Sequence, residues 1–261
     1  MKKTRWLVCI LFAVLTLTAC STSKSPLQAI RDRNMLRVGV KTDVLNFGYL
    51  NPKTNELEGL EIDLAKLIAK EIFGNEKSIK MVGVTAQTRE TMLKNGELDI
   101  VIATFTITEE RKKAFHFSAP YYHDAIGFLV RKDSGLSSFE DLNGKTIGIA
   151  QFGTAHSALM TEAEARGITL QYQQFASYPE IMAALSAGRV DAFSVDKSIL
   201  TGYRNEDTLI LDVSFNPQDY GIAVNKDNAA FAKYLDELMA TIEKDGRLEE
   251  ILSRWDAKTE E

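Results

Sequence analysis

The sequence predicts a two-lobed α/β fold, in which two sheets of parallel strands are covered by helices and joined by two crossover strands. Strands and helices alternate in two blocks of similar size, one on each side of residue 140, and such a block forms a parallel sheet. The roughly 240 residues after the leader exceed the usual size of a single core. Two extended apolar segments, 125–133 and 218–224, follow the blocks and suit the two crossings.

The first residues are typical of an export signal. Three basic residues precede an apolar run from Trp6 to Leu17, which is shorter than the roughly 20 residues that span a bilayer. Residues 17–20, Leu-Thr-Ala-Cys, resemble the bacterial lipobox. We therefore expect a signal peptide at 1–19, lipid on Cys20, and an anchor and tether over 20–34. The alternative is a cysteine that stands at an ordinary cleavage site.

Charge and cysteine content exclude two further features of the mature chain. Without the three basic residues of the leader, 28 Lys and Arg remain against 36 Asp and Glu, a net charge of about −8. No basic run remains, which argues against a nucleic-acid partner. The other cysteine, Cys9, lies in the leader, so we expect no disulfide and a fold that depends on its core.

The elements of the two blocks follow from apolar periodicity and from glycine stops. In the first block we expect strands at 36–40, 79–84 and 99–103 and helices at 59–73 and 88–95. In the second block we expect strands at 146–150, 170–175 and 190–196 and helices at 155–166 and 179–187. C-terminal helices at 229–244 and 248–255 should return to the first lobe. The lobes are then 35–127 with 220–261, and 128–219.

The strand at 99–103 leads into a candidate binding segment, because ligands of open α/β sheets bind beyond the carboxyl ends of strands. Thr104 and Thr106 alternate onto one side, and Arg111 reaches back from the first turn that follows. A guanidinium can hold both oxygens of a carboxylate in one plane. The alternative is that Thr108 caps this turn and Arg111 pairs with a neighbouring glutamate on the surface.

Several stretches resemble one known family. They are GLEIDLAKLIAKEI, NGELDIVIATFTITEERKKAFHFSAPYY, GKTIGIAQFGT, ALSAGRVDAFSVD and YGIAV, and they cover most of the mature chain. They resemble the polar-amino-acid substrate-binding proteins of ABC importers, most of all the bacterial aspartate/glutamate binders. The resemblance implies a type II periplasmic-binding-protein fold that closes like a Venus flytrap, an amino-acid ligand, and a permease partner in the membrane. We expect a monomer without a cofactor.

The resemblance also implies roles for residues on both sides of the cleft. It assigns Arg111 and Thr106 to the α-carboxylate of the ligand and Asp196 to its α-ammonium. An N-cap for the following helix is a compatible role for Asp196. Gly153 and Thr154 should place a helix N-terminus against the same carboxylate. The sequence departs from the common double-threonine pattern after Thr154, which weakens the assignment of a hydroxyl contact there.

Three residues predict an acidic ligand. Lys41, Arg89 and Tyr178 match positions that acidic-amino-acid binders use for the side-chain carboxylate. Three cations, counting Arg111, against Asp196 should suit a ligand of charge −1, which favours aspartate or glutamate. Singly, the three residues also fit a strand end, a helix surface and a packing position. The alternative ligand is glutamine or another neutral polar amino acid.

Other residues carry less information about the site. Phe47 and Phe105 suit apolar cleft walls, but they suit the core equally. Glu61 and Asp63 lie two apart on one helix and should point to different faces. The three histidines lack metal-ligand spacing, and no nucleophile elbow or phosphate loop is present, so we expect neither a metal site nor an enzyme. The rival classes are a cyclohexadienyl dehydratase-like enzyme and a receptor ectodomain.

Overall fold

The computed structural model describes residues 26–257 of the chain. The expected signal peptide at 1–19, the lipid site at Cys20 and the first part of the tether lie outside the described residues. Within the described part, no helix is both long and apolar enough to cross a membrane.

The first lobe is built on a five-stranded sheet in the order β5-β1-β6-β14-β7. Its strands are β1 (Leu36–Val40), β5 (Ile79–Gly83), β6 (Ile100–Ile102), β7 (Phe115–Phe117) and β14 (Ala223–Asn225). Its helices are α1 (Pro26–Arg33), α2 (Leu60–Phe73), α3 (Arg89–Lys94), α7 (Ala229–Lys244) and α8 (Arg247–Arg254), with a 3-10 turn at η1 (Arg111–Lys113). A small antiparallel sheet adds β2 (Asp43–Val44), β3 (Gly48–Leu50) and β4 (Leu57–Glu58).

The second lobe is built on a six-stranded sheet, with β10-β9-β11-β8-β12 in order and β13 paired to β8. Its strands are β8 (Tyr122–Arg131), β9 (Thr146–Ala150), β10 (Gln171–Phe175), β11 (Ala192–Asp196), β12 (Thr208–Ile210) and β13 (Phe215–Tyr220). Its helices are α4 (Ala155–Arg166), α5 (Tyr178–Ser186) and α6 (Lys197–Tyr203), with 3-10 turns at η2 (Lys132–Ser134) and η3 (Glu140–Leu142).

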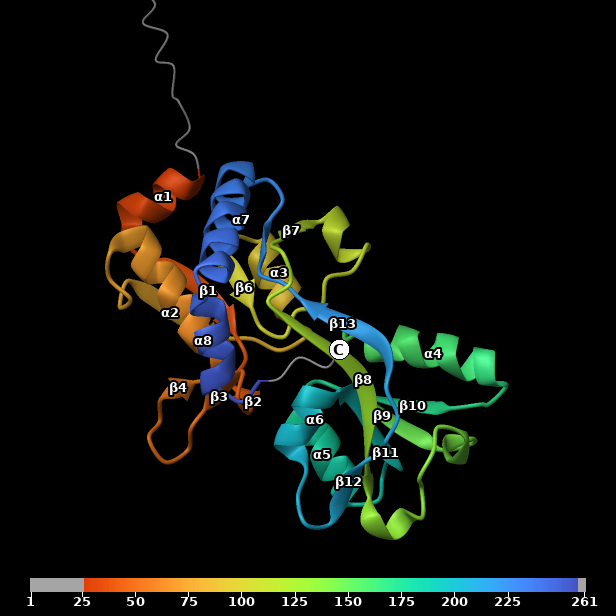
Figure 1. Cartoon of the computed structure of the whole chain (residues 1–261). Coiled ribbons are helices and arrows are strands. Elements are labelled where there is room, and N and C mark those ends of the chain that lie inside the picture. Colours follow the sequence, from red (N-terminus) through yellow and green to blue (C-terminus); the bar gives the residue numbers. More distant parts are fainter. Residues whose placement is uncertain (1–25, 258–261) are drawn as a thin grey trace, which may run out of the picture.

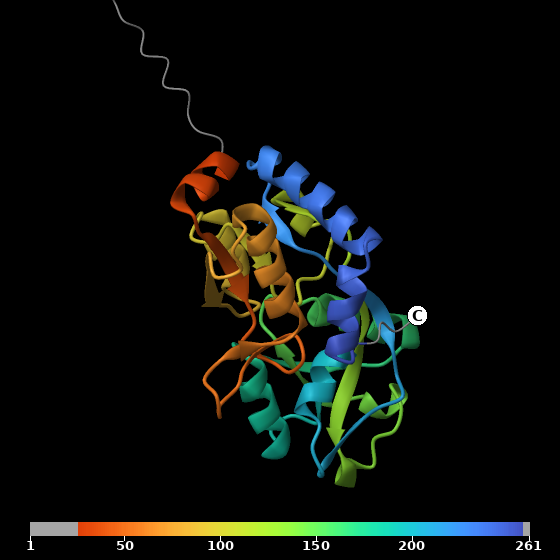
Figure 2. The same ribbon diagram turned by 60° about the vertical axis from the view of Figure 1, so that its left-hand side comes forward.

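Two antiparallel strands connect the lobes. β8 enters the second lobe and β13 leaves it, and their register pairs Tyr122 with Tyr220 at the end nearer the first lobe. Figure 1 shows this pair running from the first lobe into the second, and Figure 2 shows the lobes one above the other. The predicted lobe boundaries, at 127/128 and 219/220, fall inside these two strands. The chain therefore crosses between lobes in extended, paired backbone.

The sheets differ from the parallel sheets that we predicted. Their centres are parallel, as in the β1–β5, β1–β6 and β9–β11 pairs, but β14, β8 and β12 pair antiparallel with their neighbours. β8 crosses between the lobes, β12 precedes the return crossing of β13, and β14 follows it. Sheets that are closed by such returning segments become mixed, which a strand-by-strand pattern does not reveal.

The N-terminal helix is a second difference. Residues 26–33, which we assigned to the tether, form α1, and Ile30 on α1 is buried. Arg31 lies over the ring of Tyr234 on α7, with its guanidinium carbon 5.5 Å from the centroid. Only one residue of α1 is buried, so its apolar period was too weak to see in the sequence.

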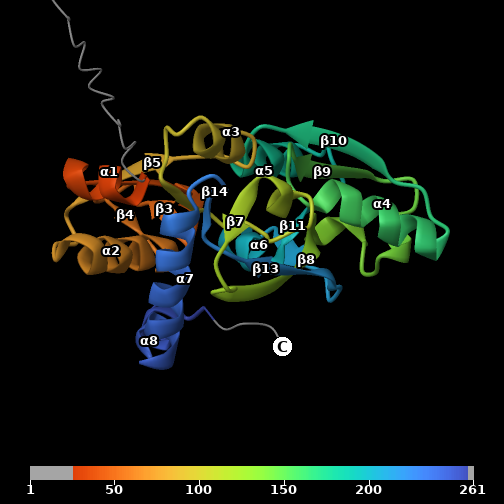
Figure 3. The same cartoon turned by 90° about the horizontal axis from the view of Figure 1, so that it is seen from above.

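The C-terminal helices pack where we expected. α7 and α8 follow each other along the first lobe, with α8 against α2 (Figure 3). At this contact the carboxylate of Asp63 on α2 accepts hydrogen bonds from Arg254 at 2.8 Å and from the Trp255 indole at 2.9 Å. The side of α2 that carries Asp63 is therefore covered by α8, and its buried residues, such as Ile62, Ala65 and Ile68, lie in the core of the first lobe.

Candidate functional site

A small cavity lies between the lobes, at the carboxyl ends of β6, β9 and β11. Its lining residues are Arg89, Thr104, Thr106, Ala150, Gly153, Thr154, Ala155, Tyr178, Ser194, Val195 and Asp196. Seven of the expected ligand-binding residues, Gly153 included, are among them. The cavity volume is about 10 Å³, which is close to the least that holds one water molecule. The lobes are thus closed on each other, and they must separate before an amino acid can enter.

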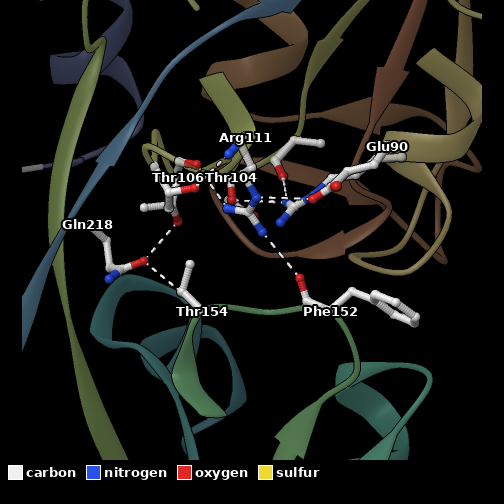
Figure 4. A network of polar contacts seen from close by, with 10 residues as sticks. Glu90, Thr104, Thr106, Arg111, Phe152, Thr154 and Gln218 are labelled. Carbon is white, nitrogen blue, oxygen red and sulfur yellow. Dashed lines mark hydrogen bonds and ion pairs between the residues drawn. The ribbon is translucent and has the colours of Figure 1, made fainter. Parts of the chain in front are cut away.

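Arg111 connects the two lobes. Its Nη1 donates to the carbonyl oxygen of Thr106 at 2.8 Å, and its Nη2 donates to the carbonyl oxygen of Phe152 in the second lobe at 3.2 Å (Figure 4). Its Nε donates to Glu90 at 3.0 Å. Burial lowers the pKa of Arg111 to about 10, and the positive charge of Arg89 adds to this. The side chain is 8% exposed, so the alternative of a surface ion pair with a neighbouring glutamate is wrong.

Thr108 nevertheless caps the turn, as that alternative supposed. Its Oγ1 accepts a hydrogen bond from the backbone N–H of Arg111 at 3.2 Å. Glu109 and Glu110, the neighbouring acids, pair with Lys112 and Lys113 on the surface. The carboxylate that holds Arg111 comes from α3, 21 residues earlier in the chain. The cap and the buried guanidinium therefore occur together.

Arg89 lies beside Arg111 on the same aromatic ring. Its guanidinium carbon is 4.2 Å from the centroid of Phe105, and that of Arg111 is 4.6 Å away. Its Nη1 donates to the carbonyl oxygens of Ala103 at 2.6 Å and Thr104 at 3.1 Å, while its Nε is buried without a hydrogen-bond partner. Phe105 itself is fully buried against other aromatic rings of the first lobe. Phe105 is thus a core residue that supports two arginines.

Lys41 is buried and already paired. Its Nζ lies 3.0 Å from Asp43 Oδ1 and 4.5 Å from the ring centroid of Tyr178. Burial lowers the pKa of Lys41, against the opposing effects of Asp43 and Glu61. Tyr178 lines the cavity, so it connects this ammonium to the site.

Asp196 lies at the carboxyl end of β11 and is 4% exposed. It accepts a hydrogen bond from the hydroxyl of Tyr220 at 2.5 Å. Burial and the neighbouring charge of Asp124 raise the pKa of Asp196 to about 7. Its side chain does not cap α6, contrary to the second role we considered, because the backbone N–H of Ser198 donates to Asp124 instead, at 3.2 Å.

Gln218 on β13 joins hydroxyl groups from both lobes. Its Oε1 accepts from Thr106 at 2.8 Å and from Thr154 at 2.7 Å (Figure 4). Its Nε2 donates to the carbonyl oxygen of Asn216 at 2.8 Å. Thr154 directly precedes α4, whose first N–H groups have no partners within the helix. The hydroxyls that we expected near a carboxylate are thus held by an amide of the connecting strand.

Phe47 lies away from the small cavity. Its ring packs against those of Tyr122 and Tyr220, with centroids 4.9 Å and 6.0 Å distant. It lines a larger neighbouring cavity of about 190 Å³, between the β2–β3 turn, the start of β8 and α6. Phe47 is therefore part of the aromatic cluster at the lobe connection in this closed arrangement.

Sequence reasoning missed five residues of the site: Glu61, Glu90, Asp124, Gln218 and Tyr220. Glu61 has a signal that we did not use, since it lies four and seven positions before buried Ala65 and Ile68 on one helix face. Glu90 lies in the short helix α3, and the other three come from the connecting strands β8 and β13, where no such periodicity marks them. Among residues 26–257, no group of His, Cys, Asp and Glu is arranged to hold a metal ion.

Comparisons with known proteins agree with this architecture. Residues 36–258 match the family model of bacterial extracellular solute-binding proteins, family 3. The ABC transporter glutamine-binding protein of Bacillus subtilis (strain 168) is 38% identical over 94% of this chain and 93% of its own length. A glutamate-binding protein of Corynebacterium efficiens is 28% identical over 92% and 86%.

A solved structure confirms the fold. The crystal structure of a cysteine-binding protein from Campylobacter jejuni superposes with a TM-score of 0.80 at 30% identity, and the match covers 88% of this chain and 92% of that one. The type II periplasmic-binding-protein fold, with two lobes and two connecting strands, is therefore the fold of this protein.

Proposed function

The chain belongs to the bacterial extracellular solute-binding proteins of family 3, and from this premise we propose that its interlobe cavity binds glutamine for an ABC importer. Family membership makes it an extracytoplasmic amino-acid-binding protein and not an enzyme. The choice of glutamine is the finer step, and the charges around the cavity support it.

The charge balance of the cavity carries the proposal. Our expectation of an acidic ligand counted Lys41, Arg89 and Arg111 against Asp196 alone. However, Lys41 pairs with Asp43 and Arg111 pairs with Glu90, both at 3.0 Å. Arg89 is then the one member of the three without a carboxylate partner among residues 26–257, and its charge offsets that of Asp196. A site without surplus positive charge suits a ligand with no net charge, such as glutamine.

The ligand contacts follow from the same geometry. Asp196 accepts hydrogen bonds from the α-ammonium group. The Thr106 and Thr154 hydroxyls release Gln218 and donate to the α-carboxylate, beside Arg111 and the first turn of α4. The amide of the glutamine side chain lies toward Arg89 and Tyr178. Contacts to both lobes make closure more favourable with the ligand than without it.

Glutamate is the second candidate, because Arg89 has a buried Nε without a hydrogen-bond partner and lines the cavity. A side-chain carboxylate satisfies this group better than an amide oxygen does. The glutamate-binding relative from Corynebacterium efficiens makes the same candidate reasonable.

Calorimetric titration of a soluble form beginning at Ser21 with glutamine, glutamate and aspartate separates the two. We expect glutamine to bind at least about tenfold more tightly than glutamate, and Arg89→Ala to reduce glutamate binding more than glutamine binding. Arg131→Ala is the matched control, since Arg131 also donates to two carbonyl oxygens but lies in the second lobe, at Leu185 and Val190. Tighter binding of glutamate in the wild type would contradict the proposal.

The position in the cell envelope completes the proposal. We propose that lipid on Cys20 holds the protein, as a monomer, on the membrane that carries its permease. Lobes of 35–127 with 220–261, and of 128–219, then move about β8 and β13. Metabolic labelling with a fatty-acid analogue tests the anchor, because Cys20→Ala should abolish the label and release the protein.

A further inference from the structure

Glu61 is a buried carboxylate beneath the cavity. It occupies the first turn of α2, where its side chain is fully buried, while Asp63 faces α8. The expectation that these two acids point to different faces is thus confirmed. Asp63 faces a neighbouring helix, whereas the carboxylate of Glu61 lies inside the first lobe. A buried charge requires partners that stabilise it.

Two groups hold Glu61 from distant parts of the chain. Its Oε1 accepts a hydrogen bond from the backbone N–H of Thr104 at 2.5 Å and from the Tyr121 hydroxyl at 2.6 Å. Its Oε2 is buried without a hydrogen-bond partner in the described chain. Thr104 has a φ of 43°, which is rare for a β-branched residue. The bond from Glu61 stabilises this unusual backbone.

Thr104 connects Glu61 to Arg89. The Thr104 N–H donates to Glu61, and the Thr104 carbonyl oxygen accepts from Arg89 Nη1 at 3.1 Å. Arg89 and Thr104 both line the cavity. The carboxylate and the guanidinium therefore bind opposite ends of one residue, and the negative charge lies directly behind the cation that faces the ligand side chain.

We propose that Glu61 is a specificity-determining residue, whose negative charge weakens the attraction of Arg89 for a carboxylate and so favours an uncharged ligand side chain. This inference rests on the proposed binding of glutamine. It differs from a structural role, because removal of the charge should change the ratio of two affinities and not only their size.

The ionisation of Glu61 makes this role testable by pH. Burial raises the pKa of Glu61 to about 7, against hydrogen bonds from Tyr121 and Thr104 and the positive charges of Lys41 and Arg89. Below pH 7 the charge is lost, so discrimination against glutamate should weaken. Protonation of Asp196 weakens the binding of the ammonium group equally for glutamine and glutamate. It therefore does not change the ratio of their two dissociation constants. The side-chain carboxyl of glutamate, with an ordinary pKa of about 4.3, stays ionised from pH 6 to 8.

Calorimetry with glutamine and glutamate at pH 6 and pH 8 tests the proposal. In the wild type, the ratio of the glutamate Kd to the glutamine Kd should be several-fold larger at pH 8. In Glu61→Gln the ratio at pH 8 should fall on the order of tenfold and lose its pH dependence. Tyr121→Phe removes a hydrogen bond that lowers the pKa of Glu61, so the ratio should change at higher pH than in the wild type. Asp99→Asn is the control, because it removes a buried carboxylate that pairs with Arg37, and it should keep the wild-type ratio.

Two results overturn the inference. One is a Glu61→Gln protein that binds both ligands more weakly but in the wild-type ratio, since that describes a purely structural residue. The other is a wild-type ratio that does not change between pH 6 and pH 8, a measurement that needs no variant to fold. If the wild type does not bind glutamine at all, the proposed function itself fails, and the inference falls with it.

Discussion

The two sides of the cleft hold their charges in different ways. On the first-lobe side, each cation is bound to protein oxygens: Lys41 to Asp43, Arg111 to Glu90 and Thr106, and Arg89 to two carbonyls. On the second-lobe side, Asp196 accepts from Tyr220 and lies near a second acid, Asp124, whose own pKa is also raised by burial.

This difference assigns different tasks to the two sides. The cations keep their positions, because carboxylates and carbonyls of the same lobe fix them. Asp196 is ionised fully only above about pH 7, and a ligand ammonium provides the positive partner that it lacks. The first lobe therefore supplies cations in fixed positions, and the second lobe supplies Asp196, an acid whose charge depends on the pH.

The largest expected effect comes from the rigid side. Arg111→Ala removes the contact between the lobes at Phe152 and leaves Glu90 and the carbonyl of Thr106 without their donor. We expect the affinity for glutamine to fall by at least about 100-fold, because the buried Arg111 is the cation beside the ligand carboxylate, and truncating one partner of such a buried charged contact costs about 2–5 kcal/mol. Calorimetry measures this loss.

The exposed neighbour Lys112 provides a control for that loss, since Lys112→Ala removes only a surface pair and should bind glutamine normally. Near wild-type affinity in Arg111→Ala would show that the Arg111 guanidinium is not needed for glutamine binding.

A pH series sharpens the contrast on the second-lobe side. The pKa of Asp196 is raised to about 7 in the folded protein, so the fraction of Asp196 that is protonated and uncharged increases as the pH falls through 7. The uncharged form cannot pair with the ligand ammonium group. Glutamine affinity should therefore decrease by about tenfold per pH unit below pH 7. Asp196→Asn should bind weakly and without this slope. Calorimetric titrations between pH 5 and pH 8 provide the measurement.

Asp124→Asn separates the two acids. It removes the charge that helps to raise the pKa of Asp196, so the midpoint of the pH dependence should move to lower pH. A flat affinity in the wild type from pH 5 to pH 7 would mean that Asp196 does not bind the ammonium group.

The smallest effect should come from Gln218, which lies between the two sides. Gln218→Met keeps the size of the side chain but leaves the Thr106 and Thr154 hydroxyls without their acceptor. Such losses cost about 1–3 kcal/mol, so the closed form without ligand should become less populated. Small-angle X-ray scattering should show a larger radius of gyration in the absence of glutamine, and Gln174→Met, at an exposed strand position, should not. An unchanged radius would show that this amide does not hold the lobes together.

Long periodic elements were predictable from the sequence. β1, β9, α4 and α7 have the predicted bounds, because each carries an apolar pattern that local chemistry and neighbouring residues determine. The short strands β2 to β4, β7 and β12 were not predicted. Strands of two or three residues contain too little pattern, and they form because distant backbone groups pair with them.

By itself the sequence indicated the fold class. The pattern after an apolar strand marked Thr104 and Thr106, and the resemblance to known binding proteins marked the other expected residues that line the cavity: Arg89, Gly153, Thr154, Tyr178 and Asp196. Only the tertiary structure decided the charge that a ligand meets. Asp43 and Glu90 pair with Lys41 and Arg111, and Glu61 reaches the residue that holds Arg89 through a bond that spans 43 residues of chain to Thr104. Coulomb interactions depend on distance and burial in the folded protein, so a count of charges along the chain could not supply this balance.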